Sequence, residues 1–217
     1  MTEPDHTPVQ AIAVVPGSHQ ETITAVALAS AMAVLQSDTN QEPWTTWLAG
    51  SFTKTVRTIK RPAQQEKIQQ DPAVVSSITI GGATAYAYAP MSYEAFPSHL
   101  RRLRVSGLDV RSTSAPLPRP RNAQIPVLAT PVVIIETNSE VEMTTGKLSA
   151  QVAHALVAWV RRAPQRNLEA WTTDPRVALV TTNFSDRNLD RPESITIRDN
   201  GLTEIDPHTP TVHIARV

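Results

Sequence analysis

Two neighbouring segments decide the fold: Val132-Val133-Ile134-Ile135 and, after Gly146, Lys147-Leu148-Ser149-Ala150-Gln151-Val152-Ala153-His154-Ala155-Leu156. The first is a short β-branched run that follows Pro131 and precedes a polar segment, which is the pattern of a buried strand. The second opens a segment, residues 147–162, whose apolar residues recur at helical spacing until Pro164 ends the pattern. A strand followed by an amphipathic helix predicts an α/β unit.

A stripe of polar side chains lies beside the apolar face of this predicted helix. At about 100° per residue, Lys147, Gln151 and His154 fall within roughly 60° of one another. The stripe starts at the helix N-terminus, where the backbone dipole favours negative charge. A lone histidine on a helix is usually an ordinary surface residue, but its combination with Lys and Gln favours a site.

The remaining C-terminal segments complete a sheet of about four strands. Further strands are predicted at residues 177–180, 194–197 and 211–214, and Asp199-Asn200-Gly201 is a turn signal after the second of these. The connection 181–193 is short, and its Pro192 and its Asp, Asn and Arg residues favour a loop. We therefore expect one side of the sheet to lack a helix, and we expect the rest of the chain to cover the apolar surface left there.

Two motifs in these segments resemble those of a known family. Gly146-Lys-Leu-Ser-Ala-Gln-Val-Ala-His-Ala155 is similar to the G-K-I-A-A-Q-x-x-H-A signature of the type 2 peptidyl-tRNA hydrolases, and residues 197–212 resemble that family's closing pattern. The resemblance covers about residues 130–217. It implies hydrolysis of the ester that joins a nascent peptide to the terminal ribose of tRNA, with tRNA as partner and without a metal or a cofactor.

The resemblance also implies roles for individual residues. It places Lys147, His154, Asp199 and Thr203 among the catalytic residues and Gln151 among those that bind substrate. Ester hydrolysis needs a base that activates water, and a cation or donors that stabilise the oxyanion. Lys147 is expected to stabilise the oxyanion or a nearby phosphate, and Thr203 to position water or substrate. One of His154 and Asp199 is expected to act as the base and the other as the orienting group, and the choice between them stays open.

The composition limits the other functions. The 217 residues carry 20 basic and 20 acidic side chains, balanced within each half, which excludes a polycationic nucleic-acid binder but allows local basic patches. The absence of cysteine excludes disulfides, thiol catalysis and thiolate metal sites. The six histidines show no metal-ligand spacing. A polar start and the lack of an 18-residue apolar run predict a cytoplasmic protein without a membrane span.

A proline-rich stretch divides the chain. Residues 115–121 read Ala-Pro-Leu-Pro-Arg-Pro-Arg, a composition that favours extended conformations and excludes a helix. We expect a linker at 115–126 between an N-terminal half, 1–114, and a C-terminal half, 127–217.

The N-terminal half has a similar order of predicted elements. Strands are expected at 11–15, 51–59 and 83–89, and helices at 22–35 and 93–104. The tripeptide Trp-Thr-Thr occurs at 44–46 and again at 171–173, an offset of 127. We therefore predict an α/β protein in which a mixed sheet of about four strands with flanking helices is duplicated as an intrachain pseudo-dimer. Under this offset Lys147, Gln151 and His154 correspond to Gln20, Thr24 and Ala27, so the first copy is expected to be inert.

Several basic residues of the N-terminal half are candidates for contacts with tRNA phosphates: Lys54, Arg57, Lys60 and Arg61. A run of charges is otherwise a solvated face. Because the resemblance implies a homodimeric family, an intrachain pseudo-dimer predicts a monomer, and a homodimer stays open. Two other functions stay open as well: a non-catalytic binding protein that retains the hydrolase fold, and a hydrolase of another ester or amide.

Overall fold

Each half of the chain forms one four-stranded mixed sheet. The computed structural model describes residues 7–111, 131–185, 187–199 and 205–216. The first sheet has the order β2-β1-β4-β3 and the second has the order β6-β5-β8-β7. Their strands are β1 (Gln10–Val15), β2 (Lys54–Thr58), β3 (Val74–Ile80), β4 (Ala83–Tyr88), β5 (Val132–Asn138), β6 (Arg176–Thr182), β7 (Ile195–Arg198) and β8 (Pro210–Ile214).

The two sheets have the same topology, so the predicted duplication is confirmed. In the first, β1 is parallel to β2 and antiparallel to β4, and β3 is antiparallel to β4. In the second, β5 is parallel to β6 and antiparallel to β8, and β7 is antiparallel to β8. The register also repeats, because Gln10 pairs with Lys54 and Val132 pairs with Arg176.

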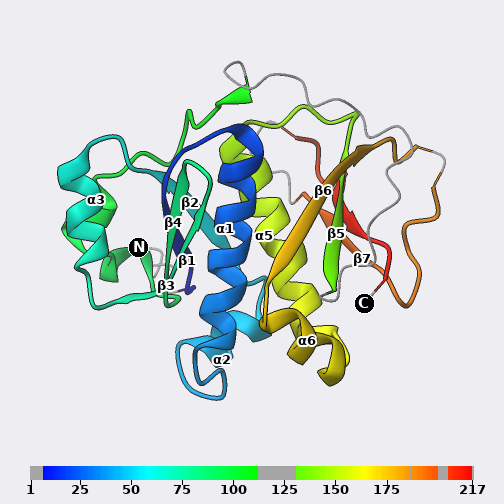
Figure 1. Cartoon of the computed structure of the whole chain (residues 1–217), viewed down its shortest axis with the longest axis horizontal. Coiled ribbons are helices and arrows are strands. Elements are labelled where there is room, and N and C mark those ends of the chain that lie inside the picture. The colour runs from blue at the N-terminus through cyan, green and yellow to red at the C-terminus, as the bar shows by residue number, and fades with distance from the viewer. Residues whose placement is uncertain (1–6, 112–130, 186, 200–204, 217) are drawn as a thin grey trace, which may run out of the picture.

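Two long helices lie side by side between the sheets (Figure 1). They are α1 (His19–Leu35) and α5 (Thr145–Arg162), and each follows the first strand of its half. The shorter helices are α2 (Trp44–Ala49), α3 (Pro62–Gln69), α4 (Ser98–Arg101) and α6 (Gln165–Thr172), with one 3₁₀ turn at Tyr93–Ala95. The layers are therefore sheet, helix pair and sheet.

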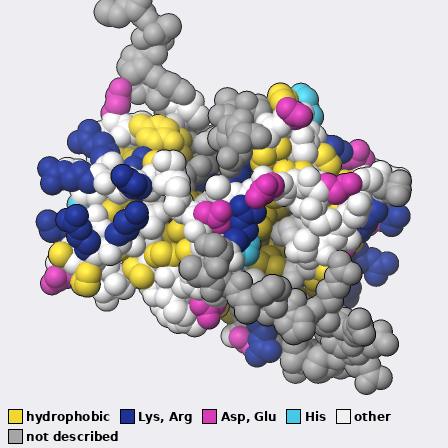
Figure 2. All heavy atoms as spheres, turned by 90° about the horizontal axis from the view of Figure 1, so that it is seen from above, with side chains coloured by type: hydrophobic (Ala, Val, Ile, Leu, Met, Phe, Trp, Pro, Cys, Tyr) yellow, Lys and Arg dark blue, Asp and Glu magenta, His cyan; other side chains and the backbone are white. Residues whose placement is uncertain are grey.

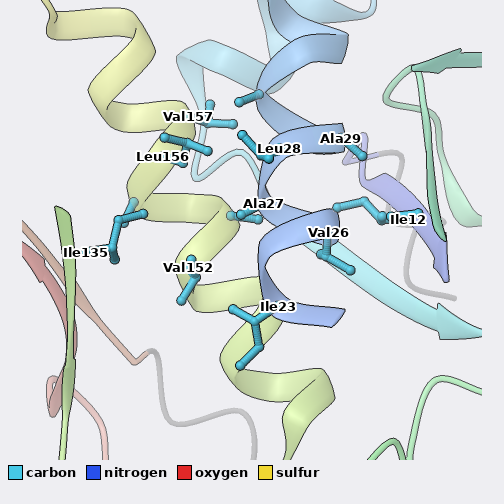
Figure 3. Packing of buried hydrophobic residues seen from close by; sticks show 14 of the residues in the cluster. Ile12, Ile23, Val26, Ala27, Leu28, Ala29, Ile135, Val152, Leu156 and Val157 are labelled. Carbon is cyan, nitrogen blue, oxygen red and sulfur yellow. The ribbon is translucent and has the colours of Figure 1, made fainter. Parts of the chain in front are cut away.

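The helix pair forms the centre of one continuous hydrophobic core. Small and aliphatic residues on all sides of α1 are buried, as expected for a helix with packing partners all around it. Figure 3 shows Leu28 of α1 and Leu156 and Val157 of α5 pointing toward one another, while Ile12 and Ile135 close the core from the two sheets. The halves therefore share their core.

The outer faces of the two sheets differ. In the N-terminal half, α3 and α4 cover a second cluster that includes Tyr86, Phe96 and Leu100. The β6–β7 connection contains no helix in its described residues, and Phe184 and Leu189 from this loop are buried instead. Ile134 and Val180 stay exposed on this face. The expectation that the rest of the chain covers it is therefore wrong, because the N-terminal half packs against the α5 side of the sheet.

Three details of the N-terminal half also differ from the predictions. The helix expected over 93–104 is only the 3₁₀ turn and the short α4, and the strand β3 and helix α3 were not predicted. The Trp-Thr-Thr triplets are not equivalent, since Trp44 begins α2 and Trp171 lies in the last turn of α6. The proposed linker, 115–126, lies outside the described residues.

Candidate active site

A pocket of about 800 Å³ lies where the two halves meet. The C-terminal half lines it with residues of α5 and with the end of β7. The N-terminal half lines it with the start of β2, with Tyr93 and with the segment 105–108. Of the residues predicted to form a site, five line this pocket: Lys54, Lys147, Gln151, His154 and Asp199. The N-terminal half, which the sequence predicts to be inert, therefore forms one of the walls.

A network of polar contacts fixes Asp199 at the bottom of the pocket. Its carboxylate, which is 2% exposed, forms an ion pair with Lys147 and accepts a hydrogen bond from Gln151 Nε2 at 2.9 Å. The carbonyl of the Gln151 side chain accepts in turn from Thr211 Oγ1 at 3.2 Å. The buried charge is thus paired and hydrogen-bonded, as its removal from water requires. Gln151 thus contacts Asp199 and Thr211, and its predicted contact with substrate stays a prediction.

Residues of both halves position the N-terminus of α5. The Thr144 side chain caps the helix by accepting from the Lys147 backbone, and the carbonyl of Leu108 accepts from the Gly146 backbone at 2.9 Å. A Cβ on Gly146 would lie 3.3 Å from Leu108 Cβ, so the glycine allows this close approach. Thr145 Oγ1 also lies 2.9 Å from His19 Nδ1, on α1. The N-terminal half therefore helps to place Lys147.

His154 lies two turns beyond Lys147, about 10 Å along the helix axis at 1.5 Å per residue. Its half-buried ring packs on Phe52 of the N-terminal half, with 5.2 Å between ring centroids. Within the described residues no hydrogen bond engages its ring nitrogens. Burial, followed by the positive charges of Lys54 and Lys147, holds the pKa of His154 well below its usual 6.5. A neutral imidazole that faces a pocket has the properties of a general base.

Lys54 is the second cation beside His154. Its Nζ donates to the Phe52 carbonyl at 3.1 Å and lies 4.7 Å from the ring centroids of Trp47 and Phe52. The side chain is buried without a carboxylate partner in the described part of the chain, and burial lowers its pKa well below 10.5. The predicted contact of Lys54 with substrate therefore belongs inside the pocket rather than on an outer surface.

The other predicted site residues that the structure describes are not in the pocket. Arg57 is buried, with its guanidinium directed at the carbonyls of Leu100 and Leu103 at 3.4 and 3.2 Å, so its assignment as a phosphate contact is wrong. Lys60 and Arg61 are exposed beyond the opposite end of β2. Thr203 lies outside the described residues.

The equivalent position in the N-terminal half is closed by its own residues. Matching the N-caps Ser18 and Thr144 gives the helices an offset of 126, which places Glu21 at the position of Lys147. The Glu21 carboxylate accepts hydrogen bonds from the backbone of Ser18 and of Gly82. A two-residue turn at Gly81 and Gly82 replaces the segment that carries Asp199. The offset of 127 is thus wrong by one residue, although both offsets remove the base.

Sequence reasoning missed the pocket wall contributed by Phe52, Tyr93 and residues 105–108. These residues carry no motif, and only the pairing of the two halves brings them to α5. Among the described residues, no three His, Asp or Glu side chains cluster in a way that could hold a metal ion. No described helix has the length and apolar character needed to cross a membrane.

Comparison with known proteins shows similarity for the C-terminal half. Residues 131–216 match the family model described as peptidyl-tRNA hydrolase PTH2. A relative named peptidyl-tRNA hydrolase, from Staphylothermus marinus, is 37% identical over 94 residues, an alignment that covers 37% of this chain and 74% of the relative. The match to the family model begins at residue 131, so it includes Lys147, Gln151, His154 and Asp199 and leaves out the first sheet.

Proposed function

The chain belongs to the peptidyl-tRNA hydrolase PTH2 family, and from this premise we propose that it hydrolyses the ester bond of peptidyl-tRNA or of another N-blocked aminoacyl-tRNA. The products are tRNA with a free terminal hydroxyl and a peptide with a free carboxylate. This substrate arises where ribosomes work, which supports the predicted location in the cytoplasm. One observation carries the proposal: the Lys147–Asp199 pair faces the same pocket as His154, whose neutral ring has no hydrogen-bond partner among the described residues.

We assign the general base to His154. Asp199 is already engaged by Lys147 and Gln151, whereas the described residues leave the imidazole nitrogens open to a water molecule. The imidazole removes a proton from water as the water oxygen attacks the ester carbon. The bond between that carbon and the ribose oxygen then breaks, and the imidazolium returns the proton to the ribose oxygen.

Lys147 stabilises the negative charge that develops on the carbonyl oxygen. Its ammonium group is held by Asp199 beside the N-terminus of α5, where the helix dipole adds positive potential. Gln151 and Thr211 keep the Asp199 carboxylate in place, and Asp199 in turn keeps Lys147 in place. This division of roles makes Lys147 and His154 catalytic residues, and Asp199 and Gln151 positioning residues.

The experiment that tests the proposal measures release of tRNA from an N-acetyl-aminoacyl-tRNA. Lys147→Ala and His154→Ala are each expected to lower kcat/KM by about 100-fold, the scale of a lost oxyanion donor or acid–base group. Arg166→Ala, which removes an exposed cation of α6, is expected to leave the rate within twofold. Circular dichroism of each variant checks that the fold is retained.

The possible outcomes separate the functions that the sequence left open. No turnover by the folded wild-type protein, together with retained tRNA binding, would support the non-catalytic binding protein instead. Turnover of another ester or amide in preference to peptidyl-tRNA would instead support a hydrolase with a different substrate. Metal independence is checked in the same assay, since extensive dialysis against EDTA is expected to leave the rate unchanged.

A further inference from the structure

We propose that the catalytically inert N-terminal half is the tRNA-docking half: its exposed basic face binds the phosphates of the acceptor arm, and the single-stranded acceptor end reaches the pocket past Tyr93. The proposal rests on the proposed function, because that function defines tRNA as the partner. The basic face consists of six exposed side chains that lie around α3, α4 and the end of β2: Lys60, Arg61, Lys67, Arg101, Arg102 and Arg104.

The charges of the basic face are available to a partner. Within the described part of the chain none of the six forms an ion pair with a carboxylate, and the exposed acids among residues 60–104 are only Glu66 and Glu94. Figure 2 shows Lys and Arg side chains gathered on the left, over the N-terminal half. Several cations of the C-terminal half are instead paired, as in Arg187–Glu136 and Arg198–Asp190. Unpaired surface cations in a cluster favour binding to a polyanion.

A short segment connects the basic face to the pocket. Arg104 pairs in antiparallel fashion with Thr58 near the end of β2, through a hydrogen bond of 2.9 Å from the Thr58 backbone. The chain then continues through residues 105–108, which line the pocket together with the start of β2. The four residue steps from Thr58 back to Lys54 span about 13 Å. A strand of nucleic acid whose phosphates contact Arg104 can therefore reach the pocket within a few nucleotides.

The rim of the pocket on this side suits an unpaired base. Tyr93 is 49% exposed and Val105 is 52% exposed, although both are apolar side chains that line the pocket. The Tyr93 ring is held by Phe96 at a centroid distance of 5.0 Å, and Phe96 is itself held by the buried guanidinium of Arg57 at 5.1 Å. A fixed, exposed aromatic ring beside basic residues is the usual platform for stacking a base of single-stranded nucleic acid.

The chemistry of the two halves is thus complementary. The C-terminal half has the polar groups that act on the ester, and the N-terminal half has the cations and the aromatic ring that recognise RNA. The acceptor arm of tRNA presents both features in the required order, a phosphate-lined helix that ends in a single strand with the ester at its terminus. Duplication followed by loss of the first catalytic site therefore yields a binding surface on the same rigid core.

The test measures the Kd of deacylated tRNA by fluorescence anisotropy over a series of salt concentrations. Arg101→Gln/Arg104→Gln is expected to raise the Kd about tenfold near 0.1 M salt, and to make the slope of log Kd against log salt shallower by about two, which corresponds to two lost phosphate contacts. The matched control, Arg166→Gln/Arg191→Gln, removes the same charge from exposed positions of the C-terminal half. It is expected to change the Kd less than twofold. The proposal would be overturned if both double variants raised the Kd equally, or if Arg101→Gln/Arg104→Gln left the Kd unchanged.

The stacking platform is tested by Tyr93 variants in the same assay. Tyr93→Ala is expected to raise the Kd about tenfold, whereas Tyr93→Phe retains the ring and is expected to bind like the wild type. An unchanged Kd for Tyr93→Ala would overturn the path over the rim. A loss of the same size in Tyr93→Phe would overturn the stacking role as well.

A short substrate separates this proposal from the proposed function. An N-acetyl-aminoacyl ester of adenosine lacks the helical arm, so Arg101→Gln/Arg104→Gln is expected to hydrolyse it at the wild-type rate and to lose about tenfold in kcat/KM only on full tRNA. Equal losses on both substrates would contradict docking by the basic face. If neither substrate is hydrolysed by the wild type, the proposed function fails, and the difference in tRNA binding still decides the docking proposal.

Discussion

His154 lies between cations that come from different halves of the chain. Lys147 precedes it on α5, and Lys54 reaches it from β2, so both charges oppose protonation of the imidazole. A homologous half alone would supply only the first of these charges. The proposed general base of the C-terminal half therefore owes part of its neutral state to the N-terminal half.

This arrangement predicts how activity depends on pH. Because the neutral form of His154 is the active one, kcat/KM is expected to fall as pH decreases through a pKa below 6.5. Lys54→Met removes a positive charge, which raises the pKa of His154, protonates more of it in mild acid and moves the acidic limb to higher pH. The measurement is the ratio of kcat/KM at pH 5.5 to that at pH 8, which is expected to drop severalfold.

The control for this profile is Arg166→Gln, which removes a cation far from the pocket-lining set and is expected to keep the wild-type ratio. A lower rate of Lys54→Met at all pH values with an unchanged ratio would show that Lys54 contacts substrate without influencing the base. A shift of the limb to lower pH would contradict the assignment of His154.

At the residue scale, motif and spacing correctly predicted that Lys147, Gln151 and His154 lie close together on one helix. The repeated Trp-Thr-Thr tripeptide, by contrast, matched tryptophans that are not equivalent. The indole of Trp171 donates to the Arg176 carbonyl at 2.9 Å, and the indole of Trp47, not of Trp44, makes the corresponding bond to Thr53 at 2.8 Å. Burial and hydrogen bonding select the equivalent tryptophan, and neither is visible in a tripeptide. Burial likewise distinguishes Arg57 from its exposed neighbours in the same basic run.

At the scale of elements, the N-terminus of α1 differs from that of α5 in what surrounds it. A side chain at Gly81 would place its Cβ 2.1 Å from Glu21 Oε1, and Gly81 has a φ of +53°. The tight turn between β3 and β4 and the carboxylate of Glu21 therefore fit together only with glycine at this position. The space that corresponds to the Lys147–Asp199 pair is filled by the protein itself.

Gly81→Ala is therefore expected to lower the free energy of unfolding by about 2–3 kcal/mol, because it adds a steric clash to the strain of a left-handed conformation. Gly107→Ala is the matched control, since Gly107 has a φ of +77° and nothing lies within 4 Å of its added Cβ. It is expected to lose only about 1 kcal/mol. The measurement is urea-induced unfolding followed by circular dichroism.

A double variant isolates the contact between the turn and the helix. With Glu21→Ala in the background, Gly81→Ala is expected to cost about as much as Gly107→Ala, because the clashing carboxylate is gone. An unchanged penalty in that background would mean that backbone strain alone explains the loss.

Two of the elements that sequence reasoning missed, α3 and β3, have a weak apolar pattern. α3 buries a single side chain, Ile68, and β3 is a half-exposed edge strand. The Gly81-Gly82 dipeptide is a hairpin signal from which β3 could have been predicted as the partner of the expected strand 83–89. By contrast, β5 was predicted from its β-branched run and α5 from its strong apolar stripe.

At the scale of the whole molecule, the sequence predicted the duplication but not the surface that joins the copies. The short 181–193 connection suggested an uncovered face of the second sheet, and the structure instead joins the halves through α1 and α5. A helix such as α1, buried on all sides, cannot be assigned a partner from its pattern, because no apolar stripe marks one face. The pocket, which depends on this joint, could not be predicted for the same reason.

A shared core predicts that the halves unfold together. Leu156→Ala removes a fully buried side chain at the α1–α5 contact and is expected to cost about 2–5 kcal/mol. Although the substitution lies in the C-terminal half, we expect it to lower the urea midpoint of both halves equally. Hydrogen exchange measured by mass spectrometry follows peptides of α1 and of α5 separately in the same sample. Ile134→Ala, on the exposed outer face of β5, is the control and is expected to cost less than about 1 kcal/mol.

The outcome decides whether the pocket is a permanent feature of the chain. If α1 and α5 lose protection at one midpoint in the wild type and at one lower midpoint in Leu156→Ala, opening the joint costs the whole stability of the molecule. Lys54, Phe52 and Tyr93 then stay beside α5 in every folded molecule. If α5 loses protection while α1 keeps its wild-type midpoint, the halves are independent domains. The wall of the pocket would then form only while they are docked, and both the neutral His154 and the path for tRNA would depend on that docking.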